Sequence, residues 1–130
     1  MSAVVVGYIP TPQGRAALRR GTEEARLRQA RLVVVNATRG DALVDDRYLQ
    51  GAAAAELRDE LSTLEVPAEL RQVSDGEDVS TALDRVAEEV GADLVVIGIR
   101  HRTPVGKLIL GSAATRILLH LRQPVLAVKV

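Results

Sequence analysis

The sequence predicts an α/β fold in which a doubly wound, five-stranded parallel sheet forms a single domain. Short runs rich in Val and Ile alternate with longer amphipathic stretches, which gives the order βαβαβαβαβ. The strand runs are apolar at nearly every position, a pattern typical of parallel strands buried on both faces. A chain of 130 residues has the length of one domain. Right-handed crossovers then favour a Rossmann-like sheet with strand order 3-2-1-4-5.

The first half of the chain supplies three strands and two helices. Thr11 and Pro12 are typical of a helix start, because Thr caps free N–H groups and Pro fits the first helical position. This helix should bury Ala17, Leu18, Gly21 and Ala25. A second helix is expected over Tyr48–Leu64, with its inner face formed by Ala53, Leu57, Leu61 and Leu64. The expected strands are Ala3–Gly7, Arg31–Asn36 and Pro67–Val73, the last near a sheet edge.

The second half of the chain continues the alternation. Ser74 and Glu77 have the spacing of a capping box, and Gly91 is placed to end the helix that follows. The expected inner face of this helix is Val79, Ala82, Leu83, Val86 and Val90. The remaining expected elements are a strand over Leu94–Ile97, a short helix opening at Gly111-Ser112, and a last strand over Val125–Val130.

The segment between Gly98 and Ser112 has the layout of a phosphate cradle: a strand, a loop with glycines, and a helix start. Glycine lets backbone N–H groups approach an anion closely, and a helix N-terminus offers unpaired donors and partial positive charge. In a doubly wound sheet this segment lies at the switch point, where ligands bind beyond the carboxyl ends of the strands. The sequence therefore predicts an anion site at Gly98, Gly111 and Ser112. The structural alternative is that the glycines only make turns and Ser112 only caps its helix.

Charge is distributed unevenly, although the net charge of the chain is zero. No Asp or Glu follows Asp93, whereas six basic residues do: Arg100, Arg102, Lys107, Arg116, Arg122 and Lys129. Arg100, His101, Arg102 and Lys107 could clamp a triphosphate, or equally a simple anion such as sulfate. The alternative is a solvated basic loop, the commoner fate of such a run.

Acidic residues also follow the second strand, at the ligand end of the predicted sheet. Asp41, Asp45 and Asp46 could hold Mg²⁺ beside phosphates, because Mg²⁺ prefers carboxylate oxygens. An exposed acidic loop is the favoured interpretation. His120 lies near the end of its helix, where a cation suits the helix dipole, and it is assigned no catalytic role.

Composition argues against several classes of protein. There is no Cys, which excludes disulfides and thiolate metal sites. Two Tyr, no Phe, no Trp and a net charge of zero argue against binding of DNA or RNA. No window is long enough to span a bilayer, so no membrane partner is expected and a cytoplasmic location is inferred. No nucleophile elbow or P-loop lysine is present, so the chain is not expected to be an enzyme, with slow nucleotide hydrolysis left open.

The stretch VVIGIRHRTPVGKLILGSAATRILLHLRQPVLAVKV, and more loosely VVVGYIPTPQGRAAL, resembles the universal stress protein (UspA-like) family over essentially residues 1–130. Nucleotide-binding members of that family carry G-x2-G-x9-G-[ST] after the fourth strand. The corresponding residues are Gly98, His101, Gly111 and Ser112, so three of the four motif positions match. The resemblance implies an adenine nucleotide alpha hydrolase-like fold, a regulatory role in stress responses and a pocket for ATP or AMP, with Mg²⁺ accompanying ATP.

Two positions depart from the family pattern. His101 replaces the second glycine, where its side chain could crowd a phosphate or offer it an N–H donor. Ile9 stands where nucleotide-binding members carry an Asp that contacts the nucleoside, and Ile cannot hydrogen-bond a ribose or adenine. Tyr8 could lie along an adenine ring or pack at the end of its strand. The chain thus keeps the phosphate side of the pocket and loses part of the nucleoside side.

Two functions stay open at the level of sequence. The first is a nucleotide-binding stress protein whose ligand stabilises the loop between Gly98 and Ser112 and alters what a dimer presents to partners. The second is a dimeric interaction module that has lost nucleotide binding. Both include a homodimer through Val125–Val130, because an apolar edge strand invites pairing with a second chain. The resembling family also pairs through its last strand.

Overall fold

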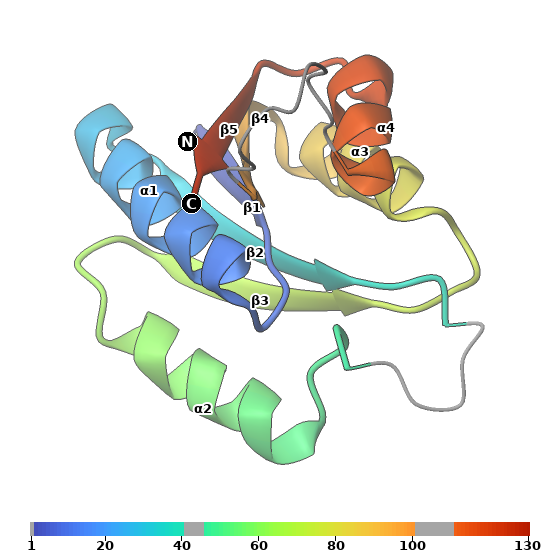
Figure 1. Ribbon diagram of the computed structural model, residues 1–130. Coiled ribbons are helices and arrows are strands. Elements are labelled where there is room, and N and C mark those ends of the chain that lie inside the picture. Colours follow the sequence, from blue (N-terminus) through green and yellow to red (C-terminus); the bar gives the residue numbers. More distant parts are fainter. Residues whose placement is uncertain (1, 41–45, 101–110) are drawn as a thin grey trace.

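The computed structural model describes residues 2–40, 46–100 and 111–130. Its five strands form one parallel sheet in the order β3-β2-β1-β4-β5, which confirms the predicted fold class and strand order. Helices α1 and α2 cover one face of the sheet, and α3 and α4 cover the other (Figure 1). The strands are β1 (Ala3–Gly7), β2 (Arg31–Ala37), β3 (Ala68–Val73), β4 (Ala92–Ile99) and β5 (Val125–Lys129).

Alternate side chains of the central strand supply two separate hydrophobic cores. In β1, Val4 and Val6 pack toward α1 and α2, whereas Ala3 and Val5 pack toward α3 and α4. All four are fully buried. Burial on both faces explains why the strand is a continuous apolar run rather than an alternating one.

The helices are α1 (Pro12–Arg28), α2 (Gly51–Ser62), α3 (Val79–Val90) and α4 (Ser112–His120). The start of α1 agrees with its prediction, because the Thr11 hydroxyl accepts a hydrogen bond from the Gly14 N–H at 3.2 Å. The end of α3 also agrees, because Gly91 adopts a left-handed φ of 64°. No helix among the described residues is long and apolar enough to cross a membrane.

The prediction for α2 is wrong at its ends and in one buried residue. The helix spans Gly51–Ser62 rather than Tyr48–Leu64, and it buries Ala54 while Ala53 is exposed. Leu57 and Leu61 are buried as expected. Four consecutive alanines precede Leu57, so hydrophobic spacing alone leaves the rotation of the first turn undetermined.

The predicted capping box at Ser74 and Glu77 is also wrong. The N-cap of α3 is Asp78, whose carboxylate accepts a hydrogen bond from the Ser80 N–H at 3.2 Å. Between the two candidate caps, Gly76 adopts a left-handed φ of 84°, a conformation that a helix starting at Ser74 would not contain. Asp78 rather than Ser74 caps the helix, because the chain turns at Gly76 before the helix begins.

Two glycines allow the first turn of α1 to pack closely against its neighbours. A Cβ on Gly98 of β4 would lie 2.0 Å from the Gln13 carbonyl oxygen, and one on Gly14 would lie 1.7 Å from the Ile9 carbonyl oxygen. No side chain fits at either place. The close packing brings the start of α1 against the carboxyl ends of β1 and β4.

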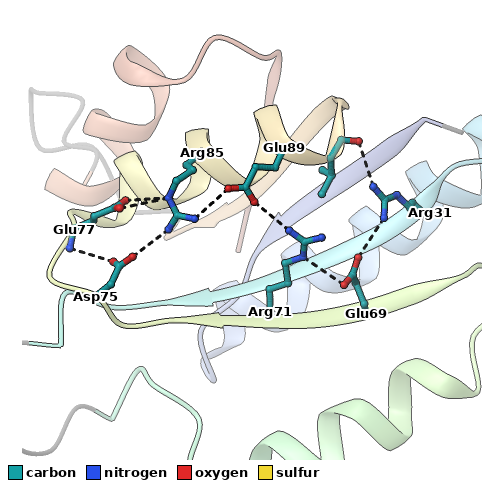
Figure 2. Close-up of polar contacts among 8 residues, drawn as sticks. Arg31, Glu69, Arg71, Asp75, Glu77, Arg85 and Glu89 are labelled. Atoms are coloured by element: carbon teal, nitrogen blue, oxygen red, sulfur yellow. Dashed lines mark hydrogen bonds and ion pairs between the residues drawn. The ribbon is translucent and has the colours of Figure 1, made fainter.

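A chain of ion pairs runs between β3 and α3, as Figure 2 shows. Arg71 pairs with Glu69 and Glu89, each at 3.4 Å, and Arg85 continues the chain by pairing with Glu89 at 3.4 Å and Asp75 at 3.3 Å. These side chains are about one-third to one-half exposed, so each pair contributes little stability by itself. The network keeps this part of the sheet surface polar.

Candidate functional site

A cleft of about 440 Å³ lies at the carboxyl ends of β1, β2 and β4, where the first residues of α3 and α4 also converge. This is the switch point of the strand order, since β1 has β2 on one side and β4 on the other. The described residues that line it are Gly7, Tyr8, Ile9, Gln13, Gly14, Val35, Ala37, Thr38, Arg39, Arg47, Asp78, Val79, Ser80, Leu83, Ile97, Gly98, Ser112, Ala113, Ala114, Arg116 and Ile117.

The floor of the cleft is apolar. Val35 and Ile97 come from strands on either side of Gly7, and Leu83 reaches the same place from α3. A Cβ on Gly7 would lie 3.3 Å from both Ile97 and Leu83, so the glycine leaves space that any side chain would reduce. A flat apolar group, such as a nucleobase, suits a floor of this kind.

The start of α4 forms a polar wall of the cleft. Gly111 is its N-cap, and no side chain in the described part of the chain bonds to this helix start. The first N–H groups of a helix, here those of Ser112, Ala113 and Ala114, have no acceptor within the helix. Ser112 and Ala113 are also exposed. Backbone donors to which no described side chain bonds, together with the positive end of the helix dipole, make this wall suitable for an anion.

Four charged residues lie among the described residues of the lining: Arg39, Arg47, Arg116 and Asp78. Arg116 Nη1 donates to Asp78 Oδ1 at 2.6 Å, which joins α4 to the start of α3. The Ser80 hydroxyl, and after it the Arg116 guanidinium, hold the pKa of Asp78 below its ordinary value. Asp78 is therefore an ionised carboxylate at the cleft.

Asn36, at the end of β2, organises the wall of the cleft beside Arg47. Its Nδ2 donates to the carbonyl oxygens of Tyr8 at 3.0 Å and Arg47 at 2.8 Å, and its Oδ1 accepts from the Leu49 N–H at 2.8 Å. Gln72 of β3 donates to the same Oδ1 at 3.3 Å. The fully buried amide thus ties β1 and β3 to the segment that carries Arg47.

The structure brings together some of the residues predicted for the site. Gly98, Ser112, Tyr8 and Ile9 all line the cleft. Tyr8 is only 6% exposed and belongs to the core on the α1 and α2 side, which agrees with packing at the strand end. Gly98 lies within β4 and packs against the first turn of α1, which is a structural role other than the turn of the stated alternative.

Other residues predicted for the site lie outside the described lining, or outside the described residues altogether. Arg100 and Gly111 are exposed and are not among the described residues of the lining. The alternative in which Ser112 caps α4 is wrong, because Gly111 holds the N-cap position. The backbone of Gly111, with φ −59° and ψ 154°, is open to other residues, and a Cβ there would meet no described atom within 4 Å. His101, Arg102 and Lys107 lie outside the described residues.

The sequence reasoning missed Asn36, Arg39, Arg47 and Asp78. A polar amide at the end of an apolar strand was the available signal for Asn36, and Asp-x-Ser before an apolar run was the signal for Asp78. The absence of Asp and Glu after Asp93 in the sequence also gave a wrong prediction of the charge around this stretch. Acids from α3 approach this stretch in space, because Arg122 pairs with Asp84 at 3.0 Å and Arg116 with Asp78.

A metal site receives little support in the described part of the chain. No group of three or more His, Asp or Glu side chains that could hold a metal ion is present among these residues. Asp46 is exposed, whereas Asp41 and Asp45 lie outside the described residues. His120 is exposed at the end of α4, and its charge helps lower the pKa of Asp84 after the stronger effect of Arg122.

Comparison with known proteins agrees with this architecture. The model of the universal stress protein family matches residues 1–129. A universal stress protein of Mycolicibacterium smegmatis (strain ATCC 700084 / mc(2)155) is 49% identical over 129 residues, which cover 97% of this chain and 96% of that protein. A solved universal stress protein from Archaeoglobus fulgidus is 26% identical with a TM-score of 0.80, covering 99% of this chain and 94% of that one. A solved universal stress protein in complex with cAMP is 25% identical with a TM-score of 0.69, covering 98% and 96%.

Sequence and fold lead to the same family. The family model spans nearly the whole chain, and the mycobacterial relative shares about half of its residues with it. The strand order and the position of the cleft agree with the resemblance carried by Gly98, Gly111 and Ser112. These matches support a universal stress protein-like function, and the chain belongs to the universal stress protein family.

Proposed function

We propose that the cleft binds an adenine nucleotide, and that the chain is one universal stress protein domain over residues 1–130 that acts by binding rather than by catalysis. The observation that carries the proposal is that an apolar floor and the uncapped backbone donors at the start of α4, as far as the described residues show, lie in one cleft. A nucleotide has the same two parts, a flat apolar base and an anionic phosphate. The solved relative in complex with cAMP supports the choice of an adenine nucleotide.

The proposed phosphate contacts are the N–H groups at the start of α4 and the hydroxyl of Ser112. Gly98, Gly111, Arg100, His101, Arg102 and Lys107 remain the other proposed residues of the phosphate side. Tyr8 and Ile9 remain proposed neighbours of the nucleoside, and Ile9 offers it a packing surface in place of a carboxylate. AMP and ATP are the proposed ligands, with Mg²⁺ accompanying ATP.

The side chains at the cleft support a regulatory rather than a catalytic role. The described lining contains no His, Cys, Lys or Glu, and its one Asp is engaged with Ser80 and Arg116. A hydrolase would need a placed base or nucleophile. We therefore infer that ligand occupancy, rather than turnover, is what a partner of this protein senses.

Ala113 offers a sharp test, because it is exposed in the first turn of α4 and lines the cleft. An Asp there suits the helix dipole, so the Ala113→Asp variant should fold normally, yet its carboxylate would repel a phosphate at the same N–H groups. We expect at least about tenfold weaker AMP and ATP binding by calorimetry. Ala113→Asn is the matched control, with nearly the same shape and no charge, and should bind within about threefold of the original chain.

The outcome decides the proposal directly. Equal affinity of the Asp and Asn variants would place the nucleotide elsewhere. Nucleotide released by acid extraction from the purified protein, and identified by mass spectrometry, would show which ligand the cleft carries. Absence of binding at millimolar nucleotide would reject the nucleotide function for this chain.

A second function, a dimeric interaction module without nucleotide, is favoured by two observations. Ile9 removes the acceptor that a nucleoside would meet after β1, and β5 forms an edge of the described sheet. In both functions the proposed homodimer pairs through Val125–Val130. The half-buried side chains of β5 and the 49% exposed Val130 leave apolar surface at that edge.

A further inference from the structure

We propose that Asp78 is an internal competitor for the phosphate-bearing ligand of the cleft, and that it disfavours polyanions by holding Arg116. The inference rests on the proposed nucleotide function and concerns the same cleft. It assigns to Asp78 a role in specificity: a ligand with few negative charges is preferred over one with many.

The ion pair that carries this proposal joins the start of α3 to α4 at the cleft. Asp78 Oδ2 accepts hydrogen bonds from the backbone N–H and the hydroxyl of Ser80, which fix the carboxylate at the start of α3. Its Oδ1 accepts from Arg116 Nη1 at 2.6 Å. Both residues line the cleft, so a ligand meets the paired guanidinium rather than a free one.

Arg116 is well placed to contact a phosphate at the start of α4. It follows Ser112 by four residues, so the two side chains lie on the same face of the helix, one turn apart. A guanidinium also matches two phosphate oxygens in geometry. The side chain is 56% exposed, which leaves it accessible to a ligand while it is paired.

The carboxylate of Asp78 therefore acts like an anion that already occupies part of the site. A phosphate that contacts Arg116 must share the guanidinium with Asp78 or displace it, and it comes close to a negative charge in either case. Repulsion grows with the number of ligand charges, so ATP is penalised more than the singly charged cAMP. Loss of the carboxylate should thus strengthen binding and reduce the preference between these ligands.

The chain contains a matched control pair outside the cleft. Asp84 of α3 pairs with Arg122, just beyond α4, with Oδ2 and Nη2 separated by 3.0 Å. Neither residue is among the described residues that line the cleft. Asp84→Asn therefore removes the same charge from the same helix and breaks the same kind of pair without changing the site.

The experiment is calorimetric titration of the full chain with sodium tripolyphosphate, ATP and cAMP. For Asp78→Asn we expect about fivefold tighter binding of ATP and tripolyphosphate and less than about twofold for cAMP, from the usual strength of an exposed ion pair. Asp84→Asn should match the original chain. Asn and Ser both keep the helix cap, so Asp78→Ser provides a second variant expected to fold.

A double variant tests whether the effect passes through the guanidinium. Arg116→Gln should weaken ATP binding. Adding Asp78→Asn to this variant should then raise the ATP affinity little, because the guanidinium that the carboxylate would have released is absent. A full gain in the absence of Arg116 would overturn the proposed competition. Equal affinities of the original chain and Asp78→Asn for all three probes would overturn it as well.

The same titrations separate this inference from the nucleotide function. Tighter tripolyphosphate binding by Asp78→Asn, without ATP or cAMP binding by any variant, would support the competitor and reject the nucleotide function. Equal nucleotide affinities of the original chain and Asp78→Asn would support the nucleotide function and reject the role of Asp78 as a competitor. No binding of any probe to any variant would overturn both.

Discussion

Asn36 shows how a single buried side chain can fix the shape of the cleft. Its amide joins the Tyr8 and Arg47 carbonyls and the Leu49 N–H, and it is fully buried. A buried polar group deprived of its partner costs about 1–3 kcal/mol. The Asn36 amide therefore stabilises the fold chiefly by giving partners to the buried backbone groups around it.

We expect Asn36→Leu to lower the free energy of unfolding by about 2–4 kcal/mol, because several buried backbone groups lose their partner. Urea unfolding measures the change. Gln72→Leu is a milder comparison, since Gln72 donates to Asn36 and to the Leu49 carbonyl at 2.9 Å and is half-buried. A loss below about 0.5 kcal/mol for Asn36→Leu would show that the surrounding groups find other partners.

Gly98 illustrates that one residue can satisfy two explanations. It occupies a position of the family's nucleotide motif, yet the Gln13 carbonyl oxygen lies where its Cβ would be. The packing requirement alone is enough to exclude other residues at this position. A glycine in a binding motif is therefore weak support for a ligand until its surroundings are known.

Among the elements, β5 decides how the sheet ends. It pairs only with β4 in the described sheet, through bonds such as those from the Val95 N–H to the Pro124 carbonyl and from the Val130 N–H to the Ile99 carbonyl. Because backbone groups alternate in direction along a strand, the N–H of Ala127 points toward the open edge. That edge is where a second chain would add to the sheet.

We expect Ala127→Pro to convert the proposed dimer into a monomer, as measured by light scattering, because proline removes an outward N–H and leaves the bonds to β4 in place. Ala127→Ser keeps the N–H and is the matched control. Val128→Pro is less suitable, because its N–H points toward β4. An unchanged dimer mass for Ala127→Pro would place the contact between chains elsewhere.

For the molecule as a whole, carboxylates of α3 connect that helix to α4 and its end. The Ser80 hydroxyl and then Arg116 hold the pKa of Asp78 below its ordinary value of 3.8, and Arg122 does the same for Asp84. A carboxyl whose pKa is lower in the folded state stabilises that state fully above the ordinary value. This stabilisation is lost as the pH falls through the lowered folded-state pKa.

We therefore expect the double variant Asp78→Asn with Asp84→Asn to be less stable than the original chain at pH 7, by about 1 kcal/mol. The difference should shrink as the pH is lowered from 5 to about 3, because protonation removes the same ion pairs from the original chain. Urea unfolding across this range measures it. Asp93→Asn, which removes one carboxylate at an exposed site on β4, is the control for the loss of charge alone. A difference that stays constant with pH would show that the carboxylates act through shape alone.

Local patterns in the sequence were sufficient to predict the order of the helices and strands and their arrangement in the sheet. The apolar runs, Thr11-Pro12 and Gly91 predicted the alternation of elements, and the right-handed crossover rule then predicted the strand order. Local patterns failed where two signals of the same kind competed, as with the caps Ser74 and Asp78. Ser and Asp are almost equally favourable at the N-cap position, and the turn at Gly76 decides which of them begins the helix.

Fold class, family and the end of the sheet at which the cleft lies could all be predicted from the sequence, because these depend on periodicity and on residues close together in the chain. Only the tertiary structure showed that Asp78 meets Arg116, residues 38 positions apart, and that Asn36 gathers three segments at the cleft. Hydrogen bonds and ion pairs act over a few ångströms in space, and the sequence does not give these distances for residues far apart in the chain. The electrostatic character of a cleft therefore depends on which helices pack together rather than on which charges are neighbours in the sequence.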